Sequence, residues 1–233
     1  SLNQKLRPVL GKLMVGLEYL FLRSGPLAMS LNQAGGFVKS EPSLGSPDLQ
    51  LYFSPLSYST APQGKRPLMS PDPYPAVRLG FNPTKPTSEG WISLESSDPR
   101  KSPKFVGNYL STKEDKKVMI SGMHLMRKFL QTKAMKNIVE EEISPGPDFK
   151  DDESFMNFVR DEGGTVFHQC GTCRMGMDVS SSVVDQGLNV HGIKGLRIVD
   201  ASIFPRITTG NTNAPAIMVG EKAADTILAD RKL

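Results

Sequence analysis

The run FHQCGTCRMG, residues 167–176, is the stretch from which the interpretation of this sequence starts. It places a histidine directly ahead of a Gly-Thr turn and after a short β-prone run at 165–167. Further on, residues 196–200 have the composition of a buried strand that ends in an acid, and a loop follows. Residues 209–215 then open a helix with polar groups. A strand, an acid, a loop and a polar helix start are parts from which a cofactor site can be built, so we expect this tail to carry the functional site.

Ahead of the tail, apolar residues three and four apart predict helices. The first covers about 10–22 and ends at Ser24-Gly25-Pro26, with Gly25 as the left-handed cap. A capping sequence at Thr112 and an acidic start at Asp151 predict two more. The side chains expected to pack inward are, on the three helices in turn, Leu10, Leu13, Met14, Leu17 and Phe21; Val118, Met119, Met123, Met126, Phe129 and Leu130; Phe155, Phe158 and Val159.

Between these helices, from Gly35 to about Tyr109, the apolar period changes to two. Leu49, Leu51 and Phe53 share one face of a strand, and proline-rich breaks separate several such runs. The pattern predicts the α+β class, with a mixed, mostly antiparallel sheet flanked by helices.

Composition narrows the classes of function. Of the 233 residues, 38% are hydrophobic and 22% charged, which is ordinary for a globular protein. A net charge of +4 without a Lys/Arg-rich run does not favour nucleic acid as a partner. Two cysteines cannot form a disulfide framework and favour a reducing compartment. We therefore expect a cytoplasmic protein, or one attached peripherally to the inner membrane.

The motifs taken together resemble the C-terminal half of the glucose–methanol–choline (GMC) oxidoreductases, and within that family the choline-dehydrogenase-like branch. They are the run around His168, VD at 184–185 before VHG at 190–192, VDASIFP at 199–205, TTGNTNAPAIMVGEKAAD at 208–225, GPLA at 25–28, NQAGGFV at 32–38, PTSEG at 86–90, DP at 98–99 and NYLS at 108–111. The resemblance implies an FAD-dependent enzyme that oxidises a primary alcohol by hydride transfer to flavin. It leaves open which alcohol is oxidised and whether electrons pass to oxygen or to a quinone.

The same resemblance implies a domain organisation. Residues 1–165 correspond to the substrate-binding region, and residues 166–233 to the active-site and FAD-contacting segment, packed with it as one unit. The family's N-terminal G-x-G-x-x-G dinucleotide fold has no counterpart here. We therefore expect a C-terminal piece that lacks its N-terminal FAD-binding half, binds no FAD alone and can self-associate through an exposed apolar patch.

Two residues are implied as catalytic. His168 occupies the family's active-site histidine position and is expected to take the alcohol proton, for which an imidazole is suited near neutral pH. Asn213 is implied to pair with it across the substrate oxygen; from the residues alone it can equally be the cap of the last helix.

Further residues are implied as contacts of the cofactor and the small alcohol substrate. Asp200 and Ala201 match the contact region of the flavin ribityl–diphosphate, although Asp200 can also cap the following turn. Asn211 and Thr212 are expected to approach the isoalloxazine through backbone groups. Tyr52 and Phe53 are expected to line the alcohol pocket, although core packing explains them almost as well.

A rival interpretation starts from Cys170 and Cys173. With His168 they could form a redox dithiol or part of a zinc site. The sequence around them supplies no fourth ligand and no thioredoxin-like βαβ unit, so we expect no metal.

Overall fold

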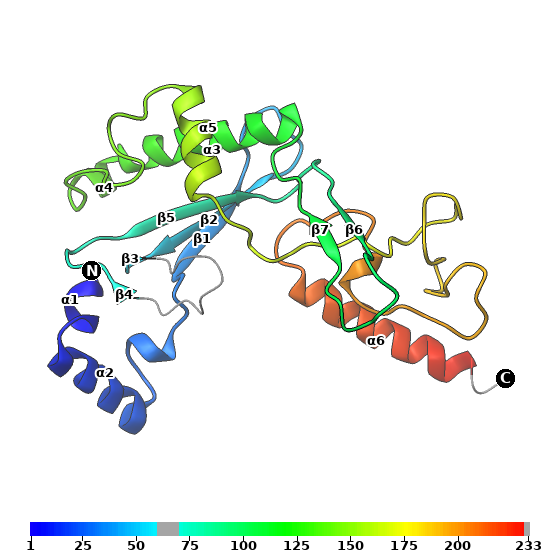
Figure 1. Cartoon of the computed structure of the whole chain (residues 1–233). Coiled ribbons are helices and arrows are strands. Elements are labelled where there is room, and N and C mark those ends of the chain that lie inside the picture. Colours follow the sequence, from blue (N-terminus) through cyan, green and yellow to red (C-terminus); the bar gives the residue numbers. More distant parts are fainter. Residues whose placement is uncertain (60–69, 231–233) are drawn as a thin grey trace. The chain divides into compact units, whose positions relative to one another are not determined.

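The computed structural model describes residues 1–59 and 70–230 (Figure 1). The chain divides into two compact units, Ser1–Asn82 and Pro83–Leu233. This boundary differs from the division at residue 165 that the motifs suggest. The division at residue 165 separates parts by their expected function, and it stays a prediction.

The first unit combines two helices with short strands. α1 covers Asn3–Leu6 and α2 covers Val9–Leu22, and a 3-10 turn, η1, follows at Pro26–Ala28. The strands are β1 (Ala34–Val38), β2 (Leu49–Ser54), β3 (Tyr58–Ser59), β4 (Ser70–Pro71) and β5 (Arg78–Pro83). Their order in the main sheet is β1-β2-β5, with β1 and β2 antiparallel; β3 and β4 form a separate antiparallel pair.

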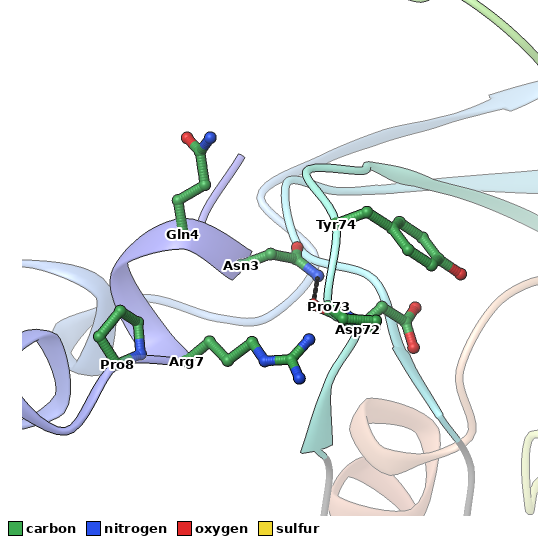
Figure 2. A pocket seen from close by; sticks show the side chains of 7 residues that line it. All are labelled: Asn3, Gln4, Arg7, Pro8, Asp72, Pro73 and Tyr74. Carbon is green, nitrogen blue, oxygen red and sulfur yellow. Dashed lines mark hydrogen bonds between the residues drawn. The ribbon is translucent and has the colours of Figure 1, made fainter.

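Asn3 fastens α1 to the strands. Its side chain is 1% exposed; the amide nitrogen donates to the Ser57 and Asp72 carbonyls, and the amide oxygen accepts from the Ser57 backbone. Figure 2 shows Asn3 at the back of a pocket that Arg7 and Tyr74 border.

Two predictions about α2 were wrong, one about its cap and one about its buried side chains. Its left-handed residue is Arg23, directly after the last turn, and Gly25 lies beyond it. The side chains expected to pack inward are 38% to 74% exposed, and in this helix the buried residue is Val15. Periodicity located the apolar face of the helix but not what covers it.

The second unit holds a β-hairpin and four helices. Its elements are β6 (Trp91–Ser93), β7 (Lys104–Val106), α3 (Lys113–Leu130), α4 (Lys133–Lys136), α5 (Asp152–Glu162), the 3-10 turn η2 (Ala201–Ile203) and α6 (Asn213–Asp230). β6 and β7 pair in antiparallel fashion, and α3 contacts α5. Helices with antiparallel sheets confirm the predicted α+β class. In the described part of the chain, no helix has the length and apolar content that crossing a bilayer requires.

Both predicted helix starts in this unit are confirmed. The Thr112 hydroxyl accepts from the Asp115 amide at 3.2 Å, and Asp151 forms a capping box with Ser154. Of the predicted inward residues, Met123 and Phe155 are buried, whereas Phe129 is 42% exposed and was wrongly assigned to the core.

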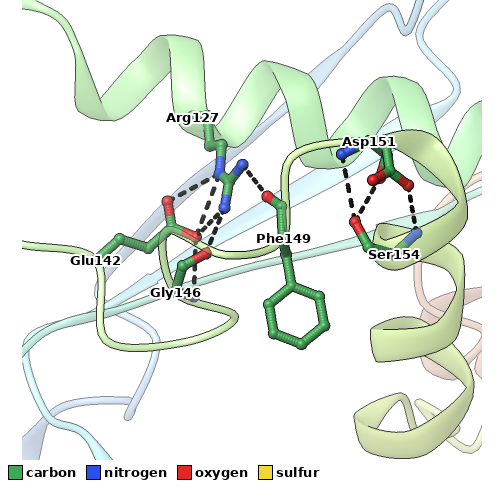
Figure 3. Close-up of polar contacts among 6 residues, drawn as sticks. All are labelled: Arg127, Glu142, Gly146, Phe149, Asp151 and Ser154. Carbon is green, nitrogen blue, oxygen red and sulfur yellow. Dashed lines mark hydrogen bonds and ion pairs between the residues drawn. The ribbon is translucent and has the colours of Figure 1, made fainter.

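Arg127 holds the loop between α4 and α5 against α3 (Figure 3). Its guanidinium pairs with Glu142 at 2.8 Å, donates to the Gly146 and Phe149 carbonyls, and lies 4.5 Å over the Phe155 ring. Both charged side chains are only about one-fifth exposed, at 22% and 21%.

Asp115 connects the start of α3 to the segment before the hairpin. One carboxylate oxygen accepts from the Thr87 amide and hydroxyl, and the other accepts from the Ser88 amide, all within 2.9 Å. Burial alone would raise the pKa of Asp115, but these hydrogen bonds hold it below the ordinary 3.8.

We predict that Arg127→Met lowers the free energy of unfolding of this unit by about 3 kcal/mol, because it leaves Glu142 and two carbonyls without their donor. Urea unfolding followed by the fluorescence of Trp91, the single tryptophan, measures this. Arg100→Met is the control, because the Arg100–Asp98 pair is exposed and contributes little. Equal midpoints for the two variants would contradict the role of Arg127.

Asp115 predicts an acid dependence of stability. Because the folded pKa is lowered, its contribution is complete above the unfolded pKa near 3.8 and is lost as the pH falls through the folded pKa. Asp115→Asn should therefore cost about 2 kcal/mol at pH 7 and progressively less below pH 4. Urea titrations at both pH values test this; a loss independent of pH would show that the charge is not what matters.

Candidate active site

The tail is a set of loops packed on a small apolar core. Val184, Ile203, Phe204 and Val219 form its buried cluster. The backbone of the cysteine run pairs with η2: the amides of Cys173 and Met175 donate to the Ser202 and Ile203 carbonyls at 3.0 and 2.7 Å. These contacts fix where the run ahead of them lies.

Two predicted strands in the tail are absent from the described residues. Residues 196–200 take part only in a single bridge, between Asn189 and Arg197, and residues 165–167 form no strand. Phe167 instead has a left-handed φ of 59° and is 81% exposed. The histidine therefore follows a strained turn and not a strand end.

A cluster of side chains holds this turn in place. The Thr165 hydroxyl accepts from the Phe167 amide at 3.0 Å, from the Gln169 amide group at 2.9 Å and from the Tyr109 hydroxyl at 3.2 Å. Gln169 also donates to the Tyr109 hydroxyl. Gln169 thus bonds to Tyr109 directly, and the Phe167 amide is linked to Tyr109 through the Thr165 hydroxyl. The sequence offered Tyr109 only as part of the NYLS motif.

His168 lies beside the start of α6. Its Nδ1 is 3.0 Å from the Thr212 hydroxyl oxygen, across 44 positions of sequence. The imidazole is half-buried, and Thr212 is 8% exposed. The structure thus brings His168 to the residue directly ahead of Asn213. The pairing of His168 and Asn213 across a substrate oxygen stays a prediction.

The helix α6 begins at Asn213, so the cap position is Thr212, one residue earlier than expected. The first intrahelical bond runs from the Ala216 amide to the Thr212 carbonyl at 2.9 Å. Asn211 and Asn213 are exposed, and amides of a first turn have no partner within their own helix. The amides of Asn213 and Ala214, the first two residues of the helix, are available to a bound group with negative charge.

The remaining predicted cofactor contacts lie at η2. Asp200 is exposed and its carboxylate accepts from the Ser202 amide at 2.7 Å, so it caps the turn; Ala201 packs on the core. The Thr208 hydroxyl is buried and, in the described residues, has no hydrogen-bond partner. Free amides at α6 and an unsatisfied hydroxyl ahead of it fit one wall of a flavin site.

Tyr52 and Phe53 lie on β2, in the first unit and not in the unit of His168. Burial raises the pKa of Tyr52, whose hydroxyl donates to the Asn82 side chain at 2.5 Å. Their role at the substrate stays a prediction.

The surroundings of Cys170 disfavour a reactive thiolate. Both thiols are free and half-buried, and burial raises the pKa of Cys170 despite the nearby charge of Arg174. A thiol with a raised pKa is a weak nucleophile and metal ligand at neutral pH. Over residues 1–59 and 70–230, no three His, Cys, Asp or Glu side chains gather as a metal site would require.

Comparisons with known proteins agree on one family. The family model of the GMC oxidoreductases matches residues 86–220, more than half of the chain. An alcohol dehydrogenase [acceptor] of Pseudomonas putida is 38% identical over 92% of this chain and 38% of its own length. An oxygen-dependent choline dehydrogenase of Staphylococcus saprophyticus is 35% identical over 98% of this chain and 40% of its own length.

Solved structures similar to this chain include oxidases. A formate oxidase of Aspergillus oryzae, studied for its FAD modification, is 26% identical with a TM-score of 0.84, over 99% of this chain and 44% of its own. A fungal aryl-alcohol oxidase is 29% identical with a TM-score of 0.66, over 81% of this chain and 28% of its own. The chain spans about two fifths of the curated relatives named above. It belongs to the GMC oxidoreductase family.

Proposed function

We propose that this chain supplies the active-site part of an FAD-dependent oxidoreductase that oxidises a primary alcohol to an aldehyde. The observation that supports the proposal is the contact of the His168 imidazole with Thr212, at the polar start of an 18-residue helix. The relatives, an alcohol dehydrogenase and choline dehydrogenases, support this substrate class. The predicted location and self-association stay predictions.

His168 takes the hydroxyl proton of the substrate. With Nδ1 directed at Thr212, Nε2 is the nitrogen left for the alcohol. Loss of that proton concentrates negative charge on the substrate oxygen, which makes the adjacent carbon a better hydride donor.

FAD, when bound, would supply the acceptor for the hydride that leaves that carbon. The exposed amides at the start of α6 stabilise negative charge that develops near them, because the helix dipole is positive there. Asn213, exposed on the first turn, donates a hydrogen bond to the substrate oxygen and shares its charge. Asp200, Ala201 and Asn211 are the residues proposed to hold the cofactor on this side.

His168→Ala should slow reduction of the flavin by alcohol about 10²-fold or more, the usual contribution of a general base. Rapid mixing of the complete, flavin-loaded protein with substrate measures it. His124→Ala is the matched control, because His124 is 53% exposed and its ring pairs with Asp152. A loss below about threefold for His168→Ala would remove it from the mechanism.

Asn213→Ala should slow flavin reduction at least about tenfold, by removing a donor to the substrate oxygen. Since Thr212 holds the cap position, the same change should leave the melting temperature unaltered. Should the variant melt earlier yet reduce flavin at the normal rate, Asn213 has a role in the helix alone.

A further inference from the structure

Three helices of the second unit have a threonine at the cap position, and their hydroxyls are used differently. At α4, which has only four residues, the Thr132 side chain accepts no capping bond. At α3, Thr112 accepts from the amide of Asp115, the third residue of the helix, at 3.2 Å. This is the usual role of a capping threonine. At α6 the third residue is Pro215, which has no amide hydrogen. The Thr212 oxygen therefore cannot accept the bond that Thr112 accepts.

The Thr212 hydroxyl points to His168 instead. Its oxygen is 3.0 Å from Nδ1, and Thr212 is 8% exposed. A buried hydroxyl that lost its capping donor and found no other would be costly. The histidine supplies the missing partner.

We propose that Thr212 is a positioning residue that selects the tautomer of His168. Pro215 frees the Thr212 oxygen from the helix cap, that oxygen accepts from Nδ1–H, and Nε2 stays unprotonated. The proposal rests on the proposed function in one respect: an unprotonated Nε2 is what a base for the alcohol needs. It assigns the Thr212 side chain a role beyond the backbone approach to the cofactor expected from the sequence.

The other two histidines of this chain provide a comparison for the tautomer of His168. His124 directs Nε2 at the Asp152 carboxylate, 2.8 Å away, and His191 directs Nε2 at the Gly176 carbonyl, 3.2 Å away. A carboxylate and a carbonyl only accept, so these contacts favour a proton on Nε2 in both rings. Nε2 of His191 also lies 3.1 Å from the Ser182 hydroxyl, which can accept as well. A hydroxyl can donate or accept. The proposal therefore predicts that His168 differs from the other two, with its proton on Nδ1.

The test compares Thr212→Val, which keeps the shape without the hydroxyl, with Thr212→Ser, which keeps the hydroxyl. In this chain, histidine labelled with ¹⁵N gives ring signals from only three residues, and His168→Ala identifies the one that matters. We expect the Nδ1–H form of His168 in the wild type and in Thr212→Ser, and loss of its dominance in Thr212→Val. Flavin reduction should slow about tenfold in Thr212→Val and recover in Thr212→Ser, on the scale of one hydrogen bond.

An Nε2–H signal for His168 in the wild type, or an unchanged tautomer and rate in Thr212→Val, would overturn the proposal. A purely structural role would lower the melting temperature of Thr212→Val and leave the tautomer as it was, which also overturns it. The tautomer is read without turnover. If His168→Ala reduces flavin normally, the proposed function fails while the assignment of Thr212 is still decided.

Pro215→Ala tests the cause. It restores an amide hydrogen at the third helix position, which then competes with His168 for the Thr212 oxygen. We expect a mixed tautomer and a rate between those of the wild type and Thr212→Val. A wild-type tautomer and rate would show that proline is not what directs the hydroxyl to the histidine.

Discussion

The described tail depends on an apolar core that is small for the length of chain it organises. Between the end of α5 and the start of α6, the regular structure is one 3-10 turn. Val184 is 0% and Ile203 3% exposed, and burial of one such side chain contributes about 1.5–3 kcal/mol. Around this core the loops exchange backbone hydrogen bonds with each other. The turn with His168 and the start of α6 are both attached to it, so their meeting follows from packing and not from a continuous secondary structure.

A series of polar contacts connects the start of α3 to the cysteine run that follows His168. Asp115 holds Thr87 and Ser88, and the next residue, Glu89, accepts from the Asn108 side chain through its carbonyl and pairs with Arg174 at 3.4 Å. The Glu89–Arg174 pair is largely exposed and contributes little by itself. Of these contacts, those of the buried Asp115 carboxylate contribute most to stability, because it accepts hydrogen bonds from two backbone amides and a hydroxyl.

Local signals were predictable from the sequence, and their surroundings were not. The helices that start after Thr112 and Asp151 could be predicted because a capping motif consists of only four consecutive residues. The predicted strand at 196–200 was wrong because an apolar segment forms a strand only beside a partner strand, and this segment packs on the core through Ile198 and Val199 instead. The exposed face of α2 shows the same limit, since a helical period does not say what covers the face.

At the candidate site the sequence indicated the residues, through their likeness to a family, but not their contacts. Both Tyr109 and the Thr212 hydroxyl reach the histidine loop across more than forty positions, a distance at which no local pattern operates. One signal was nevertheless present. Pro215 at the third position of α6 removes one of the two amides from which a capping threonine can accept, so the Thr212 oxygen is more readily available to another partner.

At the start of α6, some helix stability is therefore lost where the proposed function gains. Giving up the capping bond costs about 1 kcal/mol of helix stability. The helix tolerates this because Val219 and Ala223 anchor it in the core, and most helical stability in proteins comes from such packing. In exchange, the hydroxyl is available to hold an imidazole in one tautomer. A tenfold gain in rate corresponds to about 1.4 kcal/mol of transition-state stabilisation, so the loss and the gain are of similar size. A proline at this position is then explained by the chemistry of its neighbour, because it prevents the helix from competing for the oxygen that the histidine uses.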